Sequence, residues 1–342
     1  MLKDNENMPL FEDGPVGPSE PRGFAPSEMV RCEICLRANP PTRVNCLYCA
    51  AVLPVSEDSS QVRQPTLRPL EKWEQGYNII LKPLASDTLS TSVLSEAAAL
   101  LKSTPEIVER LISFKAGLPL CRVASVDEAS LIRQRLEILH FDTEIVSDEE
   151  LEMHEPVNRI RAAQIGEDGI MLMQAAGANG SWLPWADVRL LARGQLLTKE
   201  IETRDQKTTR GEAQLLDASE MFTDEAVLDI YGNDPRTYRI SANNFDFSCL
   251  GTQKTLLVSA NFAQLINLLR IRAPHAEYDD SYRIVRQTLE VAWPSERQTV
   301  SRGWRREYPG KYSIGSVTAN SNEVQLTRYT RLLYVLKKTA AR

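Results

Sequence analysis

The sequence predicts a multidomain α+β protein, and three observations lead to this class. Two Cys-x-x-Cys pairs stand near the start of the chain, at Cys32, Cys35, Cys46 and Cys49. Residues 74–147 alternate between short apolar runs and helical spacing, which predicts a small β-α-α-β-α-β domain. Residues 155–275 contain several strand-like segments and then one amphipathic segment, which predicts an antiparallel β-barrel-like domain closed by a helix. With 342 residues, the chain is long enough for two or three domains.

Composition and charge limit the classes of function. The chain has 40 Lys and Arg against 46 Asp and Glu, which argues against nucleic-acid binding over its whole length. No apolar run approaches the roughly 20 residues that span a bilayer, and the first residues lack a signal peptide's apolar stretch, so we expect no membrane span. Cys121 and Cys249 lie far apart in different predicted domains, which favours a reducing, cytoplasmic location over a disulfide framework.

The two cysteine pairs carry the strongest chemical signal in the chain. Each pair places two thiolates on one side of a tight turn, and the segment Asn39-Pro40-Pro41 is expected to fold the second pair back onto the first. Four sulfur ligands at this spacing predict a closed tetrahedral site for Zn within residues 30–54. The alternatives are two chance Cys-x-x-Cys pairs or disulfides in a secreted protein. Because four thiolates leave no position for water or substrate, the metal is expected to replace the core of a small module.

The spacing Cys-x2-Cys-x3-Asn-x6-Cys-x2-Cys from Cys32 to Cys49 resembles the Ran-binding-protein type of zinc finger and, more loosely, bacterial zinc ribbons. The resemblance implies a zinc-binding module. Some members of that family stack a Trp on RNA bases, and Val30 stands at the corresponding position. Leu36, Tyr48 and Leu53 are expected to pack around the turns, whereas Arg31, Arg37 and Arg43 are expected to stay exposed.

The zinc module is expected to be tethered to the rest of the chain. Residues 1–29 are rich in Pro and Gly and lack apolar periodicity, which predicts a disordered N-terminal tail. Residues 55–73 are polar with scattered Pro, which predicts a flexible linker.

Residues 74–147 are predicted to form a small α/β domain. Helices are expected at 94–101, after Thr104-Pro105, and after a capping box formed by Ser125 and Glu128. Strands are expected at 77–81, 118–123 and 142–146. This order resembles the fold shared by the ribosomal stalk protein's C-terminal domain and the ClpS adaptor. The resemblance implies a module that docks a protein partner, and the alternative is a small domain without a ligand of its own.

Residues 155–275 are predicted to be mostly β structure. A charged gap is expected at 203–211, and Ser259 is expected to cap a closing helix that stops at Pro274. Strands are expected at 159–165, 169–174, 182–188, 190–201, 226–231, 237–240 and 245–249. These strands, the final helix and the segment Leu183-Pro184-Trp185-x-Asp187-Val188 resemble bacterial pleckstrin-homology-like domains. The resemblance implies a barrel with the helix at one end.

Residues 276–342 are predicted to be a basic extension packed on the preceding domain. Helices are expected around 282–292 and after a capping box formed by Asn322 and Gln325. From residue 297 onward there are ten Lys or Arg against two Glu, and aromatic residues stand among the cations. Such a segment could follow a phosphate backbone and stack bases; the alternative is a solvated edge whose aromatic side chains pack on the preceding domain. These aromatic residues are Trp304, Tyr308 and Tyr312.

The sequence offers no recognisable set of catalytic groups. Its three histidines, His140, His154 and His275, lie in different predicted regions, and no glycine-rich phosphate loop occurs. We therefore expect a non-enzymatic zinc-binding adaptor or scaffold that docks partner proteins and acts on no small-molecule substrate. The alternative is a nucleic-acid-associated regulator that uses the zinc module and the basic C-terminal region.

Overall fold

A computed structural model of the chain confirms a mixed α/β architecture. The chain divides into two compact units, Met1–Pro65 and Thr66–Arg342, and each is described by itself. Most of the predicted tail at 1–29 and of the predicted linker at 55–73 lies outside the described residues. The structure describes residues 24–43, 46–49, 51, 53–54, 65, 67–68, 70–71, 74–84, 89–175, 180–208, 213–234, 236–308 and 311–340, without the side chains of 204–208, 213–217, 303–308, 311–314 and 340.

Among its described residues, the first unit has very little apolar interior. Strands β1 (Val30–Arg31) and β2 (Ala38–Asn39) form a two-stranded antiparallel sheet. The buried cluster of this unit consists of Cys32, Cys46 and Leu53. So small a cluster is not enough to stabilise a module by apolar burial alone, so the cysteines must contribute in another way.

The second unit begins with a layered α/β subdomain. Strands β3 (Tyr77–Leu81), β4 (Leu118–Val123) and β5 (Thr143–Ser147) form a sheet in the order β4-β3-β5, antiparallel throughout. Helices α2 (Thr91–Leu100), α3 (Pro105–Ser113) and α4 (Val126–Ile138) occupy the intervening chain, which confirms the predicted order β-α-α-β-α-β. Ser125 caps α4 as predicted by accepting from the Glu128 amide, but the Glu128 carboxylate accepts from the Leu67 amide and does not close the capping box.

A second core lies between two sheets and helix α5 (Val258–Arg272), whose apolar side chains include Phe262 and Leu265. One sheet has the order β7-β8-β9, and the other contains the inner ends of two long strands, β10 and β11, together with β12, β6 and β13. The strands are β6 (Asn158–Ile160), β7 (Ala162–Ile165), β8 (Gly169–Met173), β9 (Ser181–Pro184), β10 (Leu190–Thr208), β11 (Ala213–Tyr231), β12 (Thr237–Ser241) and β13 (Glu277–Asp279). Short 3-10 helices are η1 (Trp185–Asp187), η2 (Ala242–Asn244) and η3 (Phe247–Gln253).

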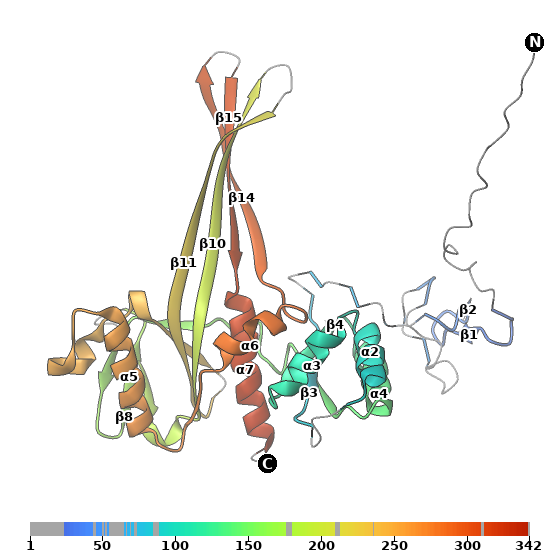
Figure 1. The fold of residues 1–342 in the computed structure, drawn as a ribbon, viewed down its shortest axis with the longest axis horizontal. Helices are drawn as coiled ribbons and strands as arrows, with labels where there is room; N and C mark the ends of the chain where they lie inside the picture. Colours follow the sequence, from blue (N-terminus) through green and yellow to red (C-terminus); the bar gives the residue numbers. More distant parts are fainter. Residues whose placement is uncertain are drawn as a thin grey trace, which may run out of the picture. The chain divides into compact units, whose positions relative to one another are not determined.

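The outer ends of β10 and β11 continue beyond this core. There they join β14 (Glu296–Tyr308) and β15 (Lys311–Ser321) in an antiparallel sheet of order β14-β15-β10-β11. Figure 1 shows these four strands rising together from the body of the second unit. We call this sheet the β arm; it consists of residues 198–208, 213–226, 296–308 and 311–321.

Two C-terminal helices, α6 (Tyr282–Leu289) and α7 (Glu323–Ala340), complete the core of the α/β subdomain. Leu326, Tyr329 and Leu332 of α7 belong to the same buried cluster as Ile79 of β3. Trp293, which is fully buried after α6, donates a hydrogen bond of 2.7 Å to Asn78 Oδ1 on β3. Segments that are distant in the chain therefore share one interior.

A buried ion pair holds α7 against the large sheet. Arg239 of β12 and Asp229 of β11 are each 1% exposed, and two hydrogen bonds of 2.7 Å join the guanidinium to the carboxylate. On α7, Thr330 donates to Asp229 Oδ2 (2.8 Å) and Thr327 accepts from Arg239 (3.1 Å). Since an unpaired charge in this interior would cost several kcal/mol, α7 and the two strands depend on one another.

Four further predictions of local structure are wrong. Residues 203–208 of the expected charged gap belong to β10. Their backbone N–H and C=O groups pair with β11 and β15, and this pairing does not require apolar side chains. The expected strand at 245–249 instead contains the start of η3, where Asp246 accepts from the Ser248 amide. Ser259 lies inside α5 and does not cap it. Asn322 and Gln325 form no capping box, because Asn322 Oδ1 accepts from the Leu197 amide and Gln325 Oε1 accepts from the Tyr282 hydroxyl.

The basic stretch at 302–312 lies along β14 and the start of β15. The side chains of Trp304, Tyr308 and Tyr312 are outside the described residues, so their predicted packing stays a prediction. Within the described part of the chain, no helix combines the length and apolar character needed to cross a membrane.

Replacing Arg239 with Ala is expected to lower the free energy of unfolding by about 3–5 kcal/mol, because Asp229 would remain buried without its partner. Arg236→Ala is the matched control: Arg236 pairs with Asp234 on the surface, where such a pair contributes about 1 kcal/mol or less. Urea unfolding followed by circular dichroism measures both changes. Similar losses in the two variants would contradict the role given to the buried pair.

Candidate metal centre

Four cysteine sulfurs converge in the first unit. The Sγ atoms of Cys32, Cys35, Cys46 and Cys49 all lie within 4.8 Å of one another. The Cys32–Cys49 and Cys35–Cys46 sulfur pairs are 3.6 Å and 3.4 Å apart, and all four thiols are free. Sulfurs placed about 2.3 Å from the centre of a tetrahedron are about 3.8 Å from one another. The cluster therefore has the size and the donor set of a four-thiolate metal site, as the sequence spacing predicted.

Short turns bring each cysteine pair together. In the first turn Leu36 adopts a left-handed backbone conformation with φ of 58°. The Cys32 amide donates to the Arg37 carbonyl (3.0 Å), and the Leu36 amide donates to the Cys32 carbonyl (2.9 Å). In the second turn the Cys46 amide donates to the Ala51 carbonyl (2.7 Å). These bonds fix both turns independently of any apolar packing.

Asn39 connects the two turns and is fully buried. Its Nδ2 donates to the Arg37 carbonyl (2.9 Å) and to Cys46 Sγ (3.4 Å), while its Oδ1 accepts from the Leu47 amide (2.8 Å). Hydrogen bonds of this kind orient metal ligands and stabilise the thiolate. The spacing pattern included Asn39, but nothing in the sequence predicted its contact with a sulfur.

The surroundings of Cys46 favour its ionised form. Burial raises the pKa of Cys46, but hydrogen bonds from the Tyr48 and Cys49 amides and from the side chains of Cys35 and Asn39 lower it to about 6. For Cys49 the Ala51 amide lowers the pKa, whereas burial and hydrogen bonds with the other three thiols raise it to about 12. The thiols thus compete for the same protons. A bound divalent cation would hold all four as thiolates and would release the remaining protons.

The apolar side chains within the two turns face outward. Ile34 is 76% exposed, Leu36 66%, Leu47 49% and Tyr48 56%. The expectation that Leu36 and Tyr48 pack around the turns is therefore wrong, because sulfur and backbone atoms already fill the interior; Leu53 is buried as expected. We call these four exposed residues the knuckle patch. Arg31, Arg37 and Arg43 are exposed as predicted, and Arg37 lies 4.6 Å from the centre of the Tyr48 ring.

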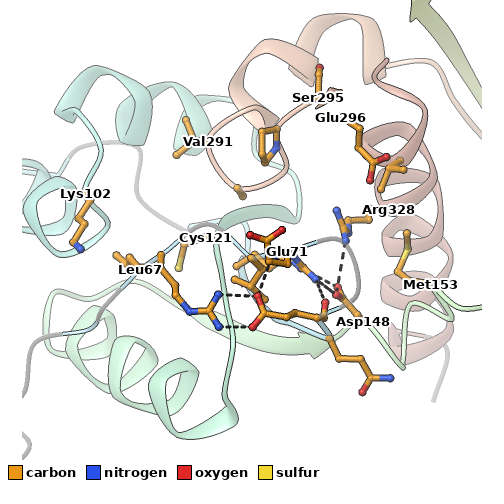
Figure 2. A pocket seen from close by; sticks show the side chains of 18 of the residues that line it. Leu67, Glu71, Lys102, Cys121, Asp148, Met153, Val291, Ser295, Glu296 and Arg328 are labelled. Carbon is orange, nitrogen blue, oxygen red and sulfur yellow. Dashed lines mark hydrogen bonds and ion pairs between the residues drawn. The ribbon is translucent and has the colours of Figure 1, made fainter. Parts of the chain in front are cut away.

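The second unit contains a pocket of about 690 Å³. Figure 2 shows Cys121 on one side of it, Glu296 and Arg328 on the other, and Asp148 between Arg328 and the sheet. Asp148 forms an ion pair with Arg122 and lies 3.8 Å from Arg328 Nη2. Its carboxylate also accepts from the Gly76 amide (2.9 Å) and from Asn78 Nδ2 (3.1 Å). These contacts tie the end of β5 to β3, β4 and α7.

The groups around this pocket are not arranged as a nucleophile and a base. Burial raises the pKa of Cys121, so its thiol stays protonated, and burial together with Arg122 lowers the pKa of Arg328 to about 10. His154 lines the pocket and is exposed, with Glu155 3.5 Å away. His140 follows α4 and His275 precedes β13, so the histidines lie in separate parts of the fold, as the sequence indicated.

Comparison of the chain with models of protein families, with curated proteins and with solved structures gives no match. The resemblances to a zinc finger, to the stalk protein and ClpS fold, and to pleckstrin-homology-like domains stay predictions. The cysteine cluster is supported by its own geometry.

Replacing Cys46 with Ser is expected to abolish stoichiometric metal binding and to unfold the first unit, because the small core of that unit cannot stabilise it alone. Elemental analysis measures the metal content, and thermal unfolding measures each unit. Cys249→Ser, a change in the second unit, is the matched control and should retain the metal. The prediction fails if Cys46→Ser still binds one ion per chain or if it also lowers the melting temperature of the second unit.

Replacing Asn39 with Ala is expected to weaken metal binding by about 10- to 100-fold, because Cys46 loses a hydrogen-bond donor and the two turns lose their link. Competition with a chromogenic chelator gives the affinity. Arg31→Ala changes an exposed side chain of the same unit and should leave the affinity unchanged. Equal affinities for all three proteins would show that Asn39 does not support the site.

Proposed function

We propose that the chain is a non-catalytic, zinc-binding adaptor or scaffold that docks partner proteins. The four-sulfur cluster supports zinc as the ion, because soft thiolates in a tetrahedral arrangement suit Zn²⁺. Iron also accepts four thiolates, and elemental analysis distinguishes the two metals. With four protein ligands the zinc has no open position, so it stabilises the module and does not activate water.

The knuckle patch is the observation that carries the docking proposal. Its residues come from both turns, and the turns are neighbours because all four ligand sulfurs lie within 4.8 Å of one another. Apolar side chains grouped on a surface commonly mark a site of protein interaction. The bound metal would hold this patch in place, although it is outside the small core.

The charges beside the patch indicate the chemistry of the partner. Arg31, Arg37 and Arg43 are exposed on the same small unit. Exposed apolar side chains with cations on the same small unit suit a peptide segment that combines apolar and acidic side chains. Within the patch, Tyr48 is the aromatic residue and Arg37 lies over its ring, which favours a peptide over stacked bases.

The second unit would act as the scaffold. Its pocket is crossed by the ion pairs of Asp148, and its buried thiol is protonated, which supports a role without catalysis. The resemblance of residues 74–147 to the stalk protein and ClpS fold supports the same class of function, because both families dock proteins. A cytoplasmic location belongs to the same proposal.

Native mass spectrometry of the full chain purified from its own host tests this function. We expect one zinc ion and a bound polypeptide. The double variant Ile34→Asp/Leu47→Asp should keep the zinc and lose the polypeptide by about tenfold or more, because it places charge within the apolar contact. Ile271→Asp, at an equally exposed apolar residue of α5, is the matched control and should keep both.

Two outcomes would contradict the adaptor function. One is a polypeptide that remains bound to the double variant at the level of the control. The other is an oligonucleotide in place of the polypeptide, with an affinity that falls steeply as salt rises, which would support the nucleic-acid alternative.

A further inference from the structure

The β arm has two long edges that no described strand covers. From Ala213 to Ala226, β11 pairs on one side with β10, and β12 covers its other side only from Val227 onward. Among the described strands, β14 pairs with β15 alone. Figure 1 shows the outer parts of both edges standing clear of the body of the second unit. A strand edge that no other strand covers can pair with a further strand through its backbone N–H and C=O groups.

The two edges carry charges of opposite sign. Residues 213–226 of β11 contain four acidic residues and no Lys or Arg, a net charge of −4. Strand β14 contains four Arg and two Glu, a net charge of +2. The acidic residues of β11 are Asp217, Glu220, Asp224 and Glu225, and the Arg residues of β14 are Arg297, Arg302, Arg305 and Arg306.

Strand direction and register also make the edges complementary. Each step in the order β14-β15-β10-β11 is antiparallel, so β14 runs opposite to β11. Through this ladder Arg297 of β14 lies level with Phe222 of β11 and on the same face. Glu220 and Asp224 share that face, two residues to either side of Phe222. If a neighbouring copy places its β11 beside β14, a register shifted by two residues from the level of Phe222 sets Arg297 opposite Glu220 or Asp224.

Symmetric pairing of like edges is unfavourable. Two copies joined through β14 and β14, or through β11 and β11, would bring two edges of the same sign together. Like charges directly across neighbouring strands destabilise a sheet. Pairing β14 with β11 avoids this repulsion and uses both edges of every copy.

We propose that the β arm is a self-assembly surface on which β14 of one copy pairs with β11 of the next copy in an antiparallel ladder. The occupant of each edge is therefore a second copy of this chain. Because the two joined edges differ, the contact repeats from copy to copy until a ring closes or a longer chain forms. The exposed side chains of Phe222 and Val300, on the two edge strands, would each lose part of their contact with water in this assembly.

A pair of charge-reversed variants tests the proposal on the full chain. Arg297→Glu/Arg305→Glu changes the net charge of β14 from +2 to −2, and Asp217→Lys/Glu220→Lys/Asp224→Lys changes that of residues 213–226 of β11 from −4 to +2. Each variant alone should require at least about tenfold higher concentration to assemble than the unmodified protein, because both of its edges then have the same sign. An equimolar mixture should assemble again, because the acidic β14 of one variant can pair with the basic β11 of the other. Mass photometry and sedimentation velocity over a concentration series measure the assembly.

Controls separate this result from misfolding and from the docking function. Arg133→Glu reverses an exposed charge on α4 and should assemble like the unmodified protein. The knuckle variant Ile34→Asp/Leu47→Asp should also assemble normally, because its changes lie in the first unit. An unmodified chain that stays monomeric up to high micromolar concentration would overturn the proposal. So would single variants that assemble normally, a mixture that stays dissociated, or assembly that occurs only when nucleic acid is added.

Discussion

The buried pair of Arg239 and Asp229 is the constraint on which the second unit depends. Neither charge is stable in the interior without the other, and hydroxyl groups of α7 complete their hydrogen bonds. Helix α7 is therefore held against the large sheet by polar contacts with strict geometry. In that position, its residues Leu326 and Tyr329 pack into the core of the α/β subdomain. Through α7, this ion pair thus links the large sheet to the α/β subdomain.

The first unit is organised by a different kind of constraint. Its sulfurs replace an apolar core, and Asn39 joins the two turns that carry them. This arrangement leaves Ile34 and Tyr48 on the outside, where in a larger domain such side chains would be buried. In the proposed metal-bound module, these apolar residues are available for contacts with other molecules, because folding would not depend on them.

The sequence predicted the features that depend on local pattern. The spacing of Cys32, Cys35, Cys46 and Cys49 predicted a cluster that the structure confirms, and periodicity predicted the order of β3 to β5 and their helices. It did not predict the outer half of β10, because charged residues there follow no apolar alternation and the strand is specified by its two neighbours. It also missed the roles of Asn39 and Asn322, whose partners are side chains and amides distant in the chain.

The shared core of the second unit has a consequence for the order of folding. The α/β subdomain ends with β5 at Ser147, but the core that it needs includes Leu326 and Tyr329 of α7. At a synthesis rate of about 5–20 residues per second, the ribosome takes roughly 10–35 seconds to extend the chain from β5 to α7. During that interval the subdomain lacks the later part of its core, which includes Trp293 and apolar residues of α6 and α7. The nascent chain therefore exposes a surface that chaperones can bind, and this subdomain completes its folding only after α7 has been made.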